Sequence, residues 1–165
     1  MKPALLVIDI QKTFFDMDAV TTQSLNNAIQ YINAAIALFR EKDLPIVVIQ
    51  HIDQENNLVP GQEGFDLPES IHLLPTDLTI HKTYGNAFNK TDLETKLRDL
   101  GVDTVILTGF CAEYCVLATS HGAQDANLHP ILLRNTLASG APERIRFVQE
   151  SSEIISLGAL KTMLS

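Results

Sequence analysis

Three residues that lie far apart in the sequence have the side chains needed for nucleophilic catalysis. Asp9, Lys82 and Cys115 each come after a short apolar run. A cysteine thiolate is a nucleophile, a carboxylate accepts the thiol proton, and an ammonium stabilises both negative charges. A carboxylate at the end of an apolar run is costly to bury without a partner. The three residues therefore indicate a cysteine nucleophile with a proton acceptor and a cation beside it.

The segment around Cys115 predicts a strand, a tight connection and a helix. The run 104–107 is short and rich in β-branched apolar residues, and Gly109 follows it closely. This pattern is typical of a buried parallel strand. Residues 116–123 contain the small side chains of a helix that lies close to a sheet. We therefore expect Cys115 in the first helical turn. The partial positive charge of the free backbone N–H groups there stabilises the thiolate relative to the thiol.

The rest of the chain alternates in the same way, which predicts a parallel sheet with helices on both faces. The apolar runs expected to form strands are 4–8, 46–49, 78–80, 104–107, 131–133 and 154–157. The segments with helical spacing are 25–39, 93–100, 116–123, 142–149 and 158–164. Residues 51–75 are irregular and rich in proline and glycine, so we expect a long loop there, as is common at functional sites. No repeat or linker indicates a second unit, so we expect one domain over residues 1–165.

The topology predicted above would bring the three reactive side chains together. In open parallel sheets, ligands bind beyond the carboxyl ends of the strands. Asp9 ends the first strand, Lys82 follows the third, and Cys115 follows the fourth. We therefore expect them to converge at one edge of the sheet.

Composition limits the classes of partner and the cellular setting. The chain has 165 residues and a formal charge of −8 without a basic run, which argues against nucleic acid and anionic membranes as partners. No apolar run approaches the length of a membrane span, and the first one ends at Asp9, too early for a signal peptide. Two cysteines are too few for a disulfide framework. These features predict a soluble cytoplasmic protein.

Three segments carry a resemblance to a known family. They are Val7–Phe14, the stretch from Lys82 to Leu93, and Gly109–Thr119. In this order and spacing they resemble the isochorismatase-like cysteine hydrolases, and the resemblance covers nearly the whole chain. It implies a three-layer α/β/α fold around a six-stranded, mostly parallel, doubly wound sheet. It also implies self-association as a dimer or tetramer.

The same resemblance assigns roles to individual residues. The catalytic Asp, Lys and Cys of the family fall on Asp9, Lys82 and Cys115. Asp9 would take the thiol proton, the thiolate would attack a carbonyl carbon, and water would hydrolyse the thioester. Lys82 would hold Asp9 ionised and favour the thiolate. The backbone N–H groups of Cys111 and Cys115 would form the oxyanion hole, and the Phe110–Cys111 peptide would be cis. This route needs no metal or organic cofactor.

The substrate is the least constrained part of the prediction. Six side chains flank the catalytic positions and are candidates for the substrate pocket: Gln11, Phe15, His51, Tyr84, Phe88 and Tyr114. The aromatic ones could line an apolar pocket or belong to the core. Gln11 and His51 could hydrogen-bond an amide. Because no arginine cluster lies near the site, a small neutral or singly charged amide, ureide or carbamoyl compound fits best.

Three other interpretations stay open at this point. Nicotinamidases of the family carry an Asp-x-His pair and a later His that bind a metal. That pair is absent here, although His51 and Asp53 remain candidate ligands for a metal-assisted amidase. Cys111 and Cys115 could instead form a redox disulfide, although their spacing is not Cys-x-x-Cys. The third interpretation is a non-catalytic interaction module on the same fold, which would not require the three reactive residues.

Overall fold

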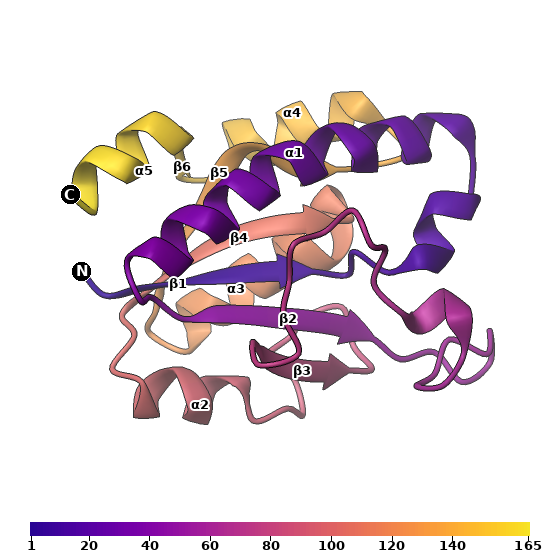
Figure 1. Ribbon diagram of the computed structural model, residues 1–165, viewed down its shortest axis with the longest axis horizontal. Helices are drawn as coiled ribbons and strands as arrows, with labels where there is room; N and C mark the ends of the chain where they lie inside the picture. The colour runs from indigo at the N-terminus through magenta and orange to yellow at the C-terminus, as the bar shows by residue number, and fades with distance from the viewer.

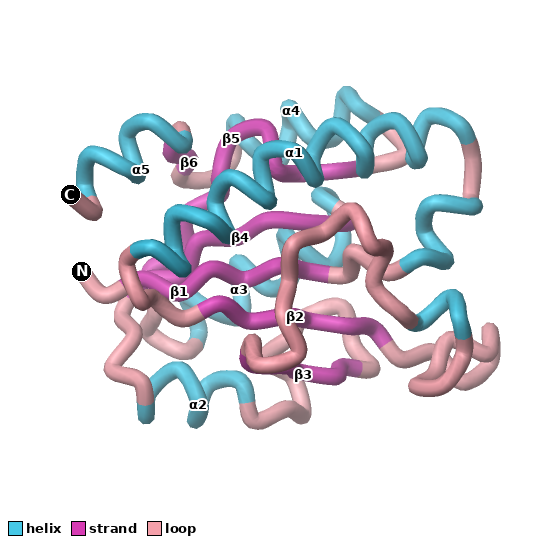
Figure 2. Tube along the Cα trace, in the orientation of Figure 1, coloured by secondary structure: helices cyan, strands magenta, loops and turns pink.

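The computed structural model describes all 165 residues as one six-stranded sheet with helices on both faces (Figures 1 and 2). The strands are β1 Pro3–Ile8, β2 Ile46–His51, β3 Leu78–Lys82, β4 Thr104–Phe110, β5 His129–Ala138 and β6 Ile154–Ile155. The helices are α1 Ala19–Glu41, α2 Leu93–Asp99, α3 Leu117–Asp125, α4 Pro142–Glu150 and α5 Leu157–Met163. Short helical turns are η1 Lys12–Asp16, η2 Glu63–Phe65 and the π-helical η3 Ala112–Val116.

All strand pairs are parallel, and the spatial order is β3-β2-β1-β4-β5-β6. The chain therefore winds outward from β1 in one direction and then from β4 in the other. The expected three-layer, doubly wound α/β/α fold is confirmed. In Figure 1 the arrowheads of β1 to β4 point to the same side of the molecule. The point where the winding direction changes, between β1 and β4, is where such sheets bind ligands.

The central strands β1 and β4 are buried along their whole length because both faces of the sheet are covered there. Along β1, Leu5 and Val7 pack into one buried cluster with α1 and α5, while Leu6 and Ile8 pack into another with α2, α3 and α4. All six residues of β1 are buried. Because both faces of β1 are packed in the apolar core, its register is fixed, and with it the position of Asp9 directly after the strand.

Helix α1 is positioned by a cap at its start and an apolar face along its length. The Asp18 carboxylate accepts a hydrogen bond from the Thr21 backbone N–H at 2.7 Å, which satisfies a free donor of the first turn. The buried face contains the residues whose spacing predicted the helix, Leu25, Ile29, Ile32, Ile36 and Phe39. No helix of the structure combines the length and the apolar character that crossing a membrane would require.

The long segment between β2 and β3 packs against the rest of the protein. Ile71 is buried in the cluster beside α1, and the Asn33 side chain hydrogen-bonds the backbone of Ser70 and of His72. Near the site, the Gln50 side chain donates to the Phe65 carbonyl. This segment is therefore anchored at several points along its length.

Candidate active site

The carboxyl ends of β1, β3 and β4 bring three charged or reactive side chains into contact. The Lys82 ammonium lies 2.9 Å from the Asp9 carboxylate and donates to the Cys115 sulfur at 3.4 Å. The side chains of Asp9 and Lys82 are almost completely buried, and Cys115 is partly exposed. The structure thus places the three sequence-predicted residues together at the switch point of the sheet.

The backbone at the ends of β1 and β4 makes this convergence possible. Asp9 has a φ of 52°, a left-handed conformation that aspartate adopts more readily than most residues. Gly109 has a φ of 116°, and any side chain there would collide with the backbone of Ile8. Glycine is therefore required where the two strand ends come closest. The Phe110–Cys111 peptide that follows is cis, as the resemblance implied.

Cys115 lies in the π-helical turn η3, directly before α3, and its thiol is not activated by that position alone. Burial, reinforced by the Asp9 carboxylate, raises the pKa of the Cys115 thiol to about 11, although Lys82 opposes the rise. The expectation that the helix start would favour the thiolate is therefore wrong for the resting protein. Desolvation near a carboxylate outweighs the partial charge of the turn.

The Asp9 carboxyl group is suited to accept the thiol proton. Burial raises the pKa of Asp9, and the Lys82 ammonium opposes that rise. One of its oxygens, Oδ2, pairs with Lys82, whereas the other, Oδ1, is buried without a hydrogen-bond partner in the chain. A buried acceptor without a donor is rare in proteins and marks a place where a reaction or ligand supplies the donor.

A cavity of about 550 Å³ opens beside these residues. Its apolar wall includes Phe14 and Phe110, whose ring centroids are 4.9 Å apart. Among the six pocket candidates, His51 and Tyr114 line the cavity. The other lining residues are Asp9, Met17, Asp18, Thr21, Asp53, Cys111, Glu113, Cys115, Gly140, Ala141 and Arg144. Its volume and its mixture of aromatic and polar groups are those of a small-molecule site.

The remaining four pocket candidates do not line the cavity. Gln11 is completely buried, and its amide is used by the backbone of His51. Phe15 lies beside η2, and Phe88 packs against the core. Tyr84 is exposed and contacts Lys90. Closeness in sequence to a catalytic residue did not predict pocket lining, because these four side chains pack against or bond to other parts of the chain.

A hydrogen-bonded network at the rim of the cavity was not predicted from the sequence. Glu113 accepts hydrogen bonds from the Cys111 thiol at 3.0 Å, the Ser139 hydroxyl at 3.0 Å and the Arg144 guanidinium at 3.2 Å. Arg144 also donates to the Tyr114 hydroxyl. The Cys111 side chain therefore belongs to the rim network. Only the pairing of acidic Glu113 with a later arginine could have suggested this network, and no spacing rule specifies it.

The residues present do not fit a metal site. No group of three or more His, Cys, Asp or Glu side chains is placed to hold a metal ion. His51 Nδ1 lies 3.0 Å from the Lys82 ammonium. The Asp53 carboxylate accepts hydrogen bonds from the backbone of Glu55 and Asn56 and from the Asn56 side chain. His51 Nδ1 and the Asp53 carboxylate are therefore engaged by other groups, and no third ligand lies beside them.

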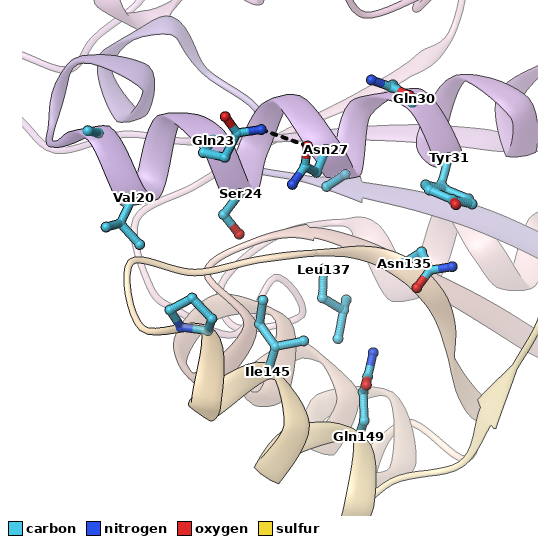
Figure 3. Close-up of a pocket in the computed structure, with 13 residues that line it drawn as sticks. Val20, Gln23, Ser24, Asn27, Gln30, Tyr31, Asn135, Leu137, Ile145 and Gln149 are labelled. Atoms are coloured by element: carbon cyan, nitrogen blue, oxygen red, sulfur yellow. Dashed lines mark hydrogen bonds between the residues drawn. The ribbon is translucent and has the colours of Figure 1, made fainter.

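A larger groove, of about 820 Å³, lies between α1, β5 and α4 (Figure 3). Asp9, Lys82 and Cys115 are not among the residues that line it. Figure 3 shows amide side chains such as Gln23, Asn27 and Gln149 around an apolar floor that includes Leu137 and Ile145. It has no carboxylate, imidazole, amine or thiol. Its size alone does not make it a catalytic site.

Comparison with known proteins assigns the chain to a family. Residues 3–151 match the isochorismatase domain. The chain belongs to the isochorismatase family. The isochorismatase family protein YddQ of Bacillus subtilis is 33% identical over 127 residues, which is 74% of this chain and 70% of that protein. This bears out the expectation of an isochorismatase-like hydrolase.

Solved structures of the family have the same fold. An isochorismatase-like hydrolase from Alkaliphilus metalliredigens superposes with a TM-score of 0.91 over the full length of both chains, at 23% identity. A pyrazinamidase from Pyrococcus horikoshii, in complex with zinc, superposes with a TM-score of 0.84 at 25% identity. It covers 95% of this chain and 100% of its own.

Proposed function

We propose that this protein is a cysteine hydrolase that cleaves the C–N bond of a small amide, ureide or carbamoyl compound. One observation carries the proposal: a buried Lys82 ammonium contacts both the Asp9 carboxylate and the Cys115 sulfur beside a cavity of small-molecule size. A nucleophile, a base and a cation in mutual contact are the groups that acyl transfer requires.

The reaction begins with the resting thiol. Because the pKa of Cys115 is raised to about 11, the thiol carries its proton at neutral pH. Asp9 accepts that proton as the sulfur attacks the substrate carbonyl carbon, and the free Oδ1 is available for it. Lys82 stabilises the negative charge on sulfur as it develops. A carboxyl group whose pKa is raised above its usual value is a stronger base and accepts a proton more readily.

The remaining steps return the enzyme to its starting state. The backbone N–H groups of Cys111 and Cys115 hold the oxyanion of the tetrahedral intermediate. The C–N bond breaks, the leaving amine takes the proton from Asp9, and a thioester remains on Cys115. Water then attacks the thioester carbonyl carbon, giving its proton to Asp9. The carboxylic acid product leaves as Cys115 regains its proton.

The lining of the cavity supports a small substrate without multiple negative charges. Phe14, Phe110 and Tyr114 supply aromatic surface, and Arg144 is already paired with Glu113. The carboxylates of Asp18 and Asp53 also line the cavity, and they repel anions. The similarity to a pyrazinamidase supports an amide as the class of substrate.

The proposal is tested by ammonia or amine release over a panel of amides, ureides and carbamoyl compounds. The wild-type protein is compared with Cys115→Ala and, as a matched control, Cys111→Ala. We expect Cys115→Ala to lose roughly 10⁴-fold or more of kcat, while Cys111→Ala keeps substantial turnover because its backbone N–H remains. Equal activity in Cys115→Ala and the wild type would show that the nucleophile is elsewhere.

No observation favours the thiol redox alternative. Burial raises the pKa of Cys111 to about 12, and its thiol donates to Glu113. With the pKa of Cys115 also raised, neither sulfur is a ready thiolate at neutral pH. Redox-active cysteines are distinguished by the opposite shift.

A further inference from the structure

The ammonium of Lys82 has three protons and three acceptors. Besides Asp9 Oδ2 at 2.9 Å and Cys115 Sγ at 3.4 Å, it contacts His51 Nδ1 at 3.0 Å. The Lys82 side chain is fully buried, so no solvent competes for these protons. A lysine ammonium rotates freely about its last bond unless its donors are all engaged. Here each proton has its own acceptor, and the direction of the proton toward sulfur is fixed by the other two.

We propose that His51 is a positioning residue of this site: its Nδ1 accepts one proton of the Lys82 ammonium and so directs another at the Cys115 sulfur. The inference rests on the proposed function, because it concerns how Lys82 stabilises the sulfur. It assigns to His51 a role inside the catalytic cluster, in addition to its place in the lining of the cavity.

The position of His51 is itself fixed by a buried polar residue. The Gln11 side chain donates to the His51 carbonyl at 3.0 Å and accepts from the His51 backbone N–H at 2.7 Å. Gln11 is completely buried, and these two bonds use both ends of its amide. A buried amide is expensive unless it is fully paired. The pairing of Gln11 with the end of β2 therefore holds the backbone of His51, from which its ring reaches Lys82.

This arrangement determines the protonation of the imidazole. An ammonium can only donate, so His51 Nδ1 must carry a lone pair, and the neutral ring carries its proton on Nε2. The Nε2 atom has no partner in the chain and is not buried, and His51 lines the cavity. Protonation of His51 would place an N–H against the ammonium and break the contact.

The charges around His51 favour the neutral ring. Lys82 faces it from β3, Asp9 from the end of β1, and Asp53 follows it in the chain. Cys115, also in contact with Lys82, is a neutral thiol at rest. Burial, and after it the Lys82 charge, lowers the pKa of His51 in spite of the two carboxylates. The acceptor is therefore available at neutral pH and is lost as the pH falls through the lowered pKa.

The first test replaces the acceptor. His51→Leu removes it, His51→Gln offers an amide oxygen in its place, and His121→Leu makes the same exchange at an exposed position on α3. We expect His51→Leu to lower kcat by about 10- to 100-fold with little change in KM, and His51→Gln to recover part of the loss. We also follow the alkylation of Cys115 by iodoacetamide at pH 8 by peptide mass spectrometry. Alkylation should be slower than in the wild type in His51→Leu but not in His121→Leu. Wild-type kcat and alkylation in His51→Leu would overturn the inference.

The second test uses the wild-type protein and so does not depend on the folding of a variant. In ¹⁵N NMR spectra of the histidine rings, we expect His51 to be the Nε2–H tautomer at pH 7, with Nδ1 unprotonated. An Nδ1–H tautomer, or a charged ring at pH 7, would contradict the inference. The proposed function fails separately, through an active Cys115→Ala variant. An inactive Cys115→Ala with an unaffected His51→Leu would leave the hydrolase intact and remove only the role of His51.

Discussion

One carboxylate–cation pair lies at the inner wall of the cavity and another at its rim, and the two pairs differ in how far they are exposed to solvent. On the inner wall, Asp9 and Lys82 are 2.9 Å apart and buried. At the rim, Glu113 and Arg144 are 3.2 Å apart, and the Arg144 side chain is 52% exposed. The rim pair is open to solvent on its arginine side, although Glu113 is only 12% exposed, whereas both members of the inner pair are closed off from solvent.

The pKa shifts of Asp9 and Glu113 show whether burial or the stabilising contacts have the larger effect on each carboxyl group. At Asp9, burial outweighs the attraction of Lys82 and raises the pKa of the carboxyl. At Glu113, burial also opposes ionisation, but hydrogen bonds from the Cys111 thiol and other donors lower the pKa. Desolvation is therefore the larger effect at the inner carboxylate, in keeping with the proton transfer proposed for it, while hydrogen bonds favour ionisation of the rim carboxylate.

Removing one partner of the inner pair should have the largest effect on both activity and stability. Asp9→Asn removes the proton acceptor, so we expect kcat to fall by about 10²–10⁴-fold. It also leaves Lys82 buried without a counter-ion, which costs about 3–5 kcal/mol of unfolding free energy. Chemical denaturation and turnover assays measure the two effects. Asp125→Asn, an exposed position on α3, is the control.

A double variant separates the pair from its parts. In Asp9→Asn with Lys82→Met, neither charge is left unpaired, so we expect the loss of stability to be smaller than the sum of the two single losses. Strictly additive losses of stability would mean that Asp9 and Lys82 do not stabilise each other. The inner pair would then be no more strongly coupled than an exposed ion pair.

The pH dependence of Cys115 reactivity should show the charge of Asp9 directly. With the pKa of the thiol at about 11, iodoacetamide alkylation should accelerate by about tenfold per pH unit from pH 7 to pH 10. A nearby carboxylate disfavours the thiolate and raises the pKa, so Asp9→Asn should lower it and speed alkylation at pH 8. If the pH dependence of alkylation were the same in Asp9→Asn as in the wild type, the Asp9 charge would have no influence on the Cys115 thiol.

Breaking the rim pair should have a much smaller effect. Arg144→Met removes a partly exposed guanidinium, and exposed ion pairs contribute little, so we expect KM to change by at most about fivefold at nearly constant kcat. Arg146→Met, which breaks the exposed pair with Glu150, is the matched control. A loss of kcat comparable to that of Asp9→Asn would place Arg144 in the chemistry rather than at the rim.

A substitution in the groove between α1, β5 and α4 should have the smallest effect on activity and stability. Gln149→Ala changes a lining amide that has no charged neighbour in the groove, so we expect kcat/KM within about twofold of the wild type and a stability change within about 0.5 kcal/mol. Steady-state kinetics and thermal denaturation measure both. A strong loss of turnover would connect the groove to the active site.

The sequence predicted the parts of the site that follow from strand ends. The buried strands are uninterrupted apolar runs, so a charge at the end of one, such as Asp9, is visible in the sequence. Lys82 and Cys115 follow apolar runs that are consecutive in the sequence, and because all the strands are parallel, the ends of these runs lie at the same edge of the sheet. The periodicity of α1 was equally readable, because its apolar face is continuous.

Other parts of the site depend on contacts that no local pattern encodes. The network of Glu113 with Ser139 and Arg144 requires that the connection after β5 passes beside the turn η3. The buried pairing of Gln11 with His51 joins the end of β1 to the end of β2. The raised pKa of Cys115 results from burial, which the sequence position of a helix start cannot show.

Trapping the acyl-enzyme would show directly whether Cys115 is the nucleophile. A substrate identified from the panel is mixed with the enzyme, the reaction is quenched in acid during turnover, and the intact protein and its peptides are analysed by mass spectrometry. We expect a mass increase equal to the acyl group, located on Cys115 and absent in Cys115→Ala. Full turnover without any adduct on Cys115, or an adduct on Cys111 instead, would contradict it.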